Sequence, residues 1–157
     1  MILSQLSLIA VPAAIVHETE EHLRRAGRRR LELFVLWSGV IEGTVFTVRT
    51  AHVPRQTSYR LDTGLMVRVD GDALHQLNIW LYEHEEVLAI QVHAHPAEAF
   101  HSDTDDAFPI VTAEGSISIV AAEFCRGGLF SEATAVYRLD ARGWSELDPP
   151  FGLFRVG

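Results

Sequence analysis

The sequence predicts an α/β fold in which short buried strands alternate with two amphipathic helices. Two segments, Glu32–Gly39 and Val87–Val92, are nearly continuous apolar runs of the kind found in strands buried on both faces. Between them, the residues after Asp70 carry apolar side chains at helical spacing. No stretch of the 157 residues has the composition of a linker, so we expect one domain over residues 1–157.

The N-terminal part predicts a strand, a helix and a hairpin. Residues Leu3–Val11 alternate loosely, as in a strand, and Pro12 suits the first turn of a helix that ends near Gly27. Residues Ile41–Arg49 begin with a turn and then alternate among β-branched side chains. This second run is therefore expected to pair with the apolar strand that precedes it.

The remainder of the chain predicts a loop, a helix and further strands. Residues His52–Thr63 show little periodicity, which favours a surface loop before a strand at Leu65–Val69. Asp70 and Asp72 suit the start of a helix that ends at about Glu86. Later strands are expected at Ser116–Phe124, at Ala135–Leu139 and around Trp144.

Composition excludes several classes of protein. The chain is 48% hydrophobic and 22% charged, which suits a packed core and argues against disorder. Its net charge of −8 argues against nucleic acid as a partner. Cys125 is the single cysteine, so we expect neither an intramolecular disulfide nor a thiolate zinc site, and we expect a reducing, cytoplasmic location. No apolar run approaches the ~18 residues of a membrane-spanning helix, and the N-terminus lacks the basic region of a signal peptide.

A dense group of residues able to bind metal or transfer protons follows the strand Val87–Val92. The group comprises His93, His95, His101, Ser102, Asp103, Asp105 and Asp106. Histidines at positions i and i+2 of a strand point to the same side, where a later carboxylate can join them. Two imidazoles and one carboxylate leave the fourth position of a zinc ion open for water, as catalysis requires. A polar loop with solvated histidines is the alternative interpretation.

The motif His93-Ala-His95-Pro96, followed by Ser102-Asp-Thr-Asp105, resembles the signature of JAMM (MPN/JAB, Mov34-type) zinc metallopeptidases. In that family a glutamate at the start of a buried strand precedes His-x-His-Pro and Ser-x-x-Asp, and here Glu32 opens the run that ends at Gly39. The resemblance implies a JAMM/MPN-like (cytidine-deaminase-like) sandwich, with a curved mixed β-sheet flanked by helices.

The resemblance also implies a role for each matching residue. His93, His95 and Asp105 would ligate one Zn²⁺ per chain, Glu32 would be the general base, and Ser102 would hydrogen-bond the developing oxyanion.

Two of these roles have alternatives within the sequence. Asp106 follows Asp105 directly and could be the third ligand, although Asp105 keeps the Ser-x-x-Asp spacing. Glu32 follows Arg28–Arg30 and could instead be a surface ion-pair partner. Both alternatives remain open at this point.

The resemblance to prokaryotic stand-alone members implies a bacterial, deubiquitinase-like isopeptidase. Such an enzyme hydrolyses the bond after the C-terminal glycine of a ubiquitin-like modifier, for maturation or deconjugation, with the modifier, its conjugates and the cognate conjugation enzymes as candidate partners. His52–Thr63 and Arg126–Glu132 are candidate segments for binding the modifier's tail. The alternatives are a non-catalytic MPN scaffold and a zinc hydrolase that acts on a small amide or a sulfur-carrier protein.

The cluster Arg24–Arg30 is the one basic run of this acidic sequence. It suits a solvated helix C-terminus, where positive charge is favourable. The alternative is a docking patch for an acidic partner or a nucleic acid.

Overall fold

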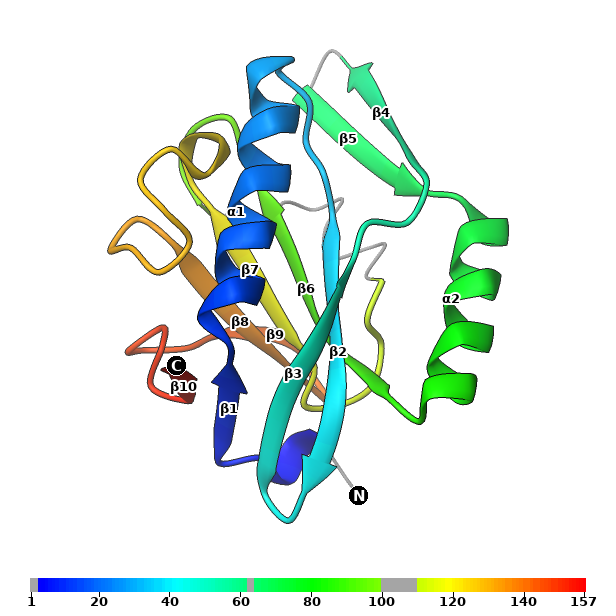
Figure 1. The fold of residues 1–157 in the computed structure, drawn as a ribbon. Coiled ribbons are helices and arrows are strands. Elements are labelled where there is room, and N and C mark those ends of the chain that lie inside the picture. The colour runs from blue at the N-terminus through cyan, green and yellow to red at the C-terminus, as the bar shows by residue number, and fades with distance from the viewer. Residues whose placement is uncertain (1–2, 62–63, 100–109) are drawn as a thin grey trace.

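The computed structural model describes residues 3–61, 64–99 and 110–157. Its centre is a curled sheet with the strand order β10-β1-β3-β2-β6-β7-β8-β9, and β4 and β5 form a separate two-stranded sheet (Figure 1). The helical elements are η1 (Leu3–Gln5), α1 (Ala13–Arg28), α2 (Gly71–His84) and η2 (Glu123–Cys125). The strands are β1 (Leu8–Val11), β2 (Val35–Glu42), β3 (Val45–His52), β4 (Gln56–Leu61), β5 (Gly64–Val69), β6 (Val87–Ala94), β7 (Ile117–Ala121), β8 (Ala135–Asp140), β9 (Gly143–Glu146) and β10 (Phe154–Val156).

The large sheet is mixed. Strand β2 lies between β3 and β6 and runs antiparallel to both, and β8 pairs antiparallel with β7 and β9. Strand β1 runs parallel to β3 and β10, and β6 runs parallel to β7. The parallel neighbours β6 and β7 therefore end at the same edge of the sheet, where His93 and His95 stand.

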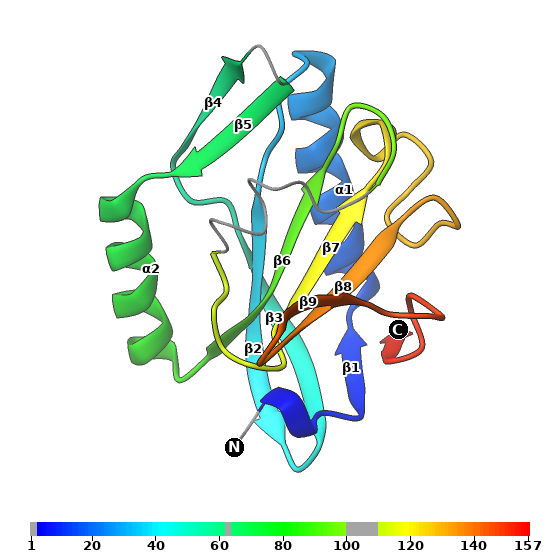
Figure 2. The same ribbon diagram turned by 180° about the vertical axis from the view of Figure 1, so that it is seen from behind.

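The two faces of the sheet carry different helices. In β2, Trp37 faces the larger core with Val16 and Leu23 of α1, whereas Leu36 faces a second cluster with Leu77 of α2. Helix α1 crosses the sheet in Figure 1 and lies behind it in Figure 2, while α2 stands to one side below the β4–β5 hairpin. In the described part of the chain, no helix combines the length and the hydropathy that crossing a membrane would demand.

The α/β fold class and most predicted elements are confirmed. The predicted loop His52–Thr63 is wrong, because β3 extends to His52 and residues Gln56–Leu61 form β4. The side chains of β4 are mostly polar, so it lacks the apolar alternation of a half-buried strand. Strand β10 was not predicted, because it is only three residues long.

Three predicted strand boundaries are also wrong. Strand β1 begins at Leu8, because Leu3–Gln5 form the turn η1. Strand β2 begins at Val35, which leaves Glu32 just before the strand. Strand β7 ends at Ala121, where the chain enters η2.

Candidate functional site

The pairing of β2 with β6 brings Glu32 to the histidines. These strands run antiparallel with Val35 opposite Val92, and extending this register by three residues places Glu32 opposite His95. The backbone N–H of His95 donates to the carbonyl of Ala121 at 2.8 Å, so His95 continues the contact of β6 with β7. Residues far apart in the sequence thus meet at one corner of the sheet.

The three side chains converge inside the protein. Nε2 of His93 lies 3.2 Å from Nε2 of His95, and Oε1 of Glu32 lies 3.7 Å from the same His95 atom. All three residues are buried, with exposed fractions of 2% for His93, 7% for His95 and 8% for Glu32. The prediction that the histidines point to one side is confirmed, and the surface location considered for Glu32 is wrong.

Neighbouring residues hold this corner in place. The ring of Phe34 packs against the ring of His93, with 4.7 Å between centroids. Ser58 of β4 donates a hydrogen bond to the carbonyl of Glu32 at 3.0 Å, and Gln56 bonds both the N–H and the carbonyl of Phe34. Strand β4 therefore supports the segment that carries Glu32.

Gln91 also belongs to this corner, although its place there was not predicted. It is 1% exposed on the same face of β6 as His93, and its amide donates to Ser118 at 3.1 Å. Its carbonyl oxygen accepts the backbone N–H groups of Ile110 and Val111 at 3.1 and 3.3 Å. Gln91 thus fixes the segment at Ile110 and Val111 against β6, beside the histidines. A single glutamine within an apolar strand was the sequence signal for this structural role.

The two imidazoles fit a shared metal ion. Two nitrogens on one tetrahedral zinc, each about 2.0–2.1 Å from it, are about 3.3 Å apart. The observed Nε2 separation of 3.2 Å is close to this value, and nitrogen donors with a carboxylate suit zinc. His93 and His95 could therefore hold a metal with the carboxylate of Glu32 beside it.

The remaining predicted site residues, Ser102, Asp105 and the alternative Asp106, lie outside the described residues. Within the described ranges, no group of three histidine, cysteine, aspartate or glutamate side chains forms a metal site. The structure thus describes two of the three predicted ligands and the predicted base.

A second polar cluster lies farther along β2 and was not predicted. Ser38 donates to Glu86 at 2.7 Å, and its oxygen lies 2.7 Å from Nε2 of His52. Burial lowers the pKa of His52, although Glu86 partly opposes this effect. In a serine hydrolase triad the imidazole lies between the hydroxyl and the carboxylate, and the substrate can reach the hydroxyl. Here the hydroxyl of Ser38 lies between the other two groups and is fully buried. This cluster joins β2 and β3 to Glu86, the residue before β6, and does not have the arrangement of a serine hydrolase triad.

Cys125 does not offer a nucleophile. Burial raises the pKa of its thiol to about 11, so the thiol stays protonated at neutral pH. Cysteine-based catalysis is thereby disfavoured.

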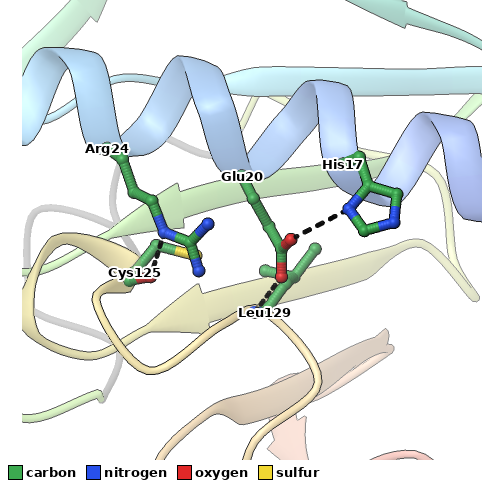
Figure 3. A network of polar contacts seen from close by, with 5 residues as sticks. All are labelled: His17, Glu20, Arg24, Cys125 and Leu129. Atoms are coloured by element: carbon green, nitrogen blue, oxygen red, sulfur yellow. Dashed lines mark hydrogen bonds and ion pairs between the residues drawn. The ribbon is translucent and has the colours of Figure 1, made fainter.

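The basic cluster at the end of α1 divides into two parts. Arg25, Arg28, Arg29 and Arg30 are exposed, as expected for a solvated helix end. The expectation is wrong for Arg24, whose Nε–H donates to the carbonyl of Cys125 at 3.0 Å (Figure 3). This residue belongs to the packing of α1 on η2.

Fold and site together define an α/β protein with a buried corner suited to a metal-dependent hydrolase. No family model matches the chain. The chain is 36% identical over 146 residues to "Probable metalloprotease y4jG" of Sinorhizobium fredii, covering 92% of this chain and 90% of that protein. This protein therefore belongs to the same metalloprotease family.

A solved structure supports the fold. The solution structure of protein DSY2949 from Desulfitobacterium hafniense matches 96% of this chain and 93% of its own, with a TM-score of 0.63 and 16% identity. At this identity the similarity concerns the α/β fold alone.

Proposed function

We propose that this protein is a zinc-dependent peptidase of the JAMM type, in which His93, His95 and Asp105 hold the metal. The observation that carries the proposal is the convergence of the two Nε2 atoms, 3.2 Å apart, beside the buried carboxylate of Glu32. The name of the relative from Sinorhizobium fredii, a probable metalloprotease, supports a peptidase that uses a metal. The order of Glu32, His-x-His-Pro and Ser-x-x-Asp in the sequence supports the JAMM type.

Glu32 is the general base in this proposal. Its Oε1 lies 3.7 Å from Nε2 of His95, so the carboxylate faces the same small volume as the imidazole pair. From there it accepts a proton from the attacking water and returns the proton to the amine that leaves when the amide bond breaks. Zinc, when bound, polarises the substrate carbonyl and lowers the pKa of its water toward ~7.

Other residues orient the reacting groups. Packing of Phe34 against His93 limits rotation of that imidazole, and the bond from Ser58 fixes the backbone of Glu32. Ser102 donates, in this proposal, a hydrogen bond to the oxygen on which negative charge develops. The burial of this corner keeps bulk water from competing for these groups.

The proposed substrate is a ubiquitin-like modifier, cut after its C-terminal glycine. Strand β4 supports this choice, because among the described residues β5 is the only strand that pairs with it. A peptide tail binds such an edge as an added strand, and β4 already contacts the backbone of Glu32 through Ser58. Tyr59 of β4 is 41% exposed and offers a side-chain contact to that tail. The second candidate segment, Arg126–Glu132, contains the fully buried Leu129, which favours a connecting role.

The test compares Glu32→Gln with Glu42→Gln, a matched change at the exposed end of β2. The substrate is a bacterial ubiquitin-like protein with a peptide fused after its final glycine, and cleavage is followed by mass spectrometry. Loss of a general base lowers kcat by about 10²–10⁴-fold, so Glu32→Gln should lose activity and keep its metal, while Glu42→Gln matches the wild type. Full activity of Glu32→Gln would refute the mechanism.

The same assay separates the alternatives. Turnover of small amides or a sulfur-carrier protein, with no cleavage of the fusion, would refute the proposed substrate and keep the metal chemistry. Metal-loaded protein that binds the modifier without turnover would identify a non-catalytic scaffold.

A further inference from the structure

The chain forms an unusual turn directly after β7, next to the histidine pair. Glu123, Phe124 and Cys125 have φ angles of 50°, 54° and 67°. These values lie in the left-handed region, which residues other than glycine rarely adopt, and here three such residues follow one another. Such a turn persists only where surrounding contacts hold it.

The left-handed turn holds the backbone of His95. The N–H of Phe124 donates to the carbonyl of His95 at 2.8 Å, and the N–H of Glu123 donates to the carbonyl of Ala97 at 2.8 Å. Pairing of β6 with β2 ends at Val92, so β2 makes no backbone bond to His95. The backbone of His95 is therefore held by Ala121 through its N–H and by the turn through its carbonyl.

Helix α1 holds this turn from the other side. Nε of Arg24 donates to the carbonyl of Cys125 at 3.0 Å, and one helical turn earlier Oε2 of Glu20 accepts the N–H of Leu129 at 2.8 Å (Figure 3). Figure 3 shows both side chains extending from the helix toward the same loop. Cys125 and Leu129 are fully buried, so these two bonds attach α1 to the buried residues at either end of this short loop.

Gly27 allows the helix to come close enough. A Cβ atom at Gly27 would overlap Cβ of Phe124, so any other residue would displace the turn. Helix α1 therefore meets the turn through a close approach at Gly27 and through the guanidinium of Arg24. A displacement of Phe124 would pass to His95 through one backbone hydrogen bond.

We propose that Arg24 is a positioning residue for His95, acting through the left-handed turn Glu123–Cys125. This inference rests on the proposed function, in which His95 is a metal ligand. Arg24 holds the carbonyl of Cys125, the turn keeps its left-handed conformation, and Phe124 keeps the main chain of His95 in the position that pairs its imidazole with that of His93. Partners that hydrogen-bond a metal ligand directly change metal affinity by about 10–100-fold when replaced, and Arg24, which acts through the turn, should change it by up to about 10-fold.

The test compares Arg24→Met with Arg25→Met. Both changes remove one positive charge from α1 and keep an unbranched stem, but Arg25 is exposed and makes no polar side-chain contact with the described residues. Each full-length protein is titrated with Co²⁺ by visible absorption, and Zn²⁺ affinity is then measured by competition. We expect Arg24→Met to weaken Co²⁺ binding by up to about 10-fold and to shift the absorption bands, while Arg25→Met matches the wild type.

A second readout does not depend on metal. In the metal-free protein, Arg24→Met should shift the amide resonance of His95 and speed hydrogen exchange at the N–H of Phe124, whereas Arg25→Met should change neither. Wild-type protein that fails to bind Co²⁺ would refute the proposed function, and these resonances would still test the positioning. Equal Co²⁺ affinity and spectra in both variants, with an unmoved His95 resonance, would overturn the inference.

Glu20 provides the test if Arg24→Met does not fold. Glu20→Gln keeps an oxygen that accepts the N–H of Leu129, and Glu20→Met removes it. We expect Glu20→Met to weaken Co²⁺ binding and Glu20→Gln to restore it. Identical binding by the two variants would overturn the link between α1 and His95.

Discussion

Replacing Thr19 with valine tests how α1 is attached to the sheet. Nε1 of Trp37 in β2 donates to Oγ1 of Thr19 at 2.8 Å, and both residues are fully buried. Thr19→Val keeps the shape of the side chain but removes the acceptor, so the indole N–H remains buried without a partner. Such a loss costs about 1–3 kcal/mol, and we expect the free energy of unfolding to fall by about 2 kcal/mol. For a chain of this size the corresponding decrease in Tm is about 4–8 °C.

The assay is urea unfolding followed by tryptophan fluorescence and by circular dichroism. Trp37→Phe and the double variant complete a double-mutant cycle. In the Trp37→Phe background no indole donor remains, so Thr19→Val should lower the free energy of unfolding by about 1 kcal/mol less than it does in the wild type. Thr19→Ser keeps the oxygen and loses one methyl group, so it should cost about 0.8 kcal/mol. A Thr19→Val protein within about 0.5 kcal/mol of the wild type would show that the bond from Trp37 does not hold α1 on the sheet.

Two further predictions concern titratable groups. Burial raises the pKa of Cys125 to about 11, some two units above an ordinary thiol, so in native protein at pH 8 we expect the thiol to react with a disulfide reagent about a hundredfold more slowly than in urea; equal rates would contradict its burial. The N–H of Arg142 and the hydroxyl of Ser145 donate to Asp140 and lower its pKa. A carboxyl group whose pKa is lower in the folded protein stabilises the fold at pH values above its pKa in the unfolded chain. This stabilisation is lost as the pH falls through the lower pKa of the folded protein. Urea unfolding should therefore find Asp140→Asn less stable than the wild type at pH 7, with a smaller difference near pH 3, and a constant difference would refute this account.

The elements that were predicted correctly are those in which burial imposes a regular pattern. Strand β6 is a continuous apolar run because it is covered on both faces, and α2 carries its apolar side chains at helical spacing. Strand β4 could not be predicted, because its contacts with the segment 32–34 come from polar side chains such as Gln56 and Ser58. The left-handed turn Glu123–Cys125 contains no glycine, so nothing in its composition distinguished it from a strand end.

In the candidate site, too, some residue positions follow from local sequence and others depend on how distant segments pack. The proximity of His93 and His95 follows from the two-residue period of one strand, which the sequence displays directly. The position of Glu32 depends on the register of β2 against β6, and its role came from the family pattern alone. Nothing in the sequence distinguished Arg24 from its neighbouring arginines, because its role depends on the packing of α1 on η2. Asp105 and Ser102 remain predictions.

The proposed function requires that His93 and His95 hold a metal ion. Elemental mass spectrometry of purified wild-type protein, beside a His93→Ala/His95→Ala variant whose fold is checked by circular dichroism, measures this metal. We predict about one zinc per chain in the wild type and none in the folded double variant, because removing both imidazoles leaves too few ligands. Wild-type protein that contains no metal and takes up no added zinc would show that the two histidines do not form a metal site.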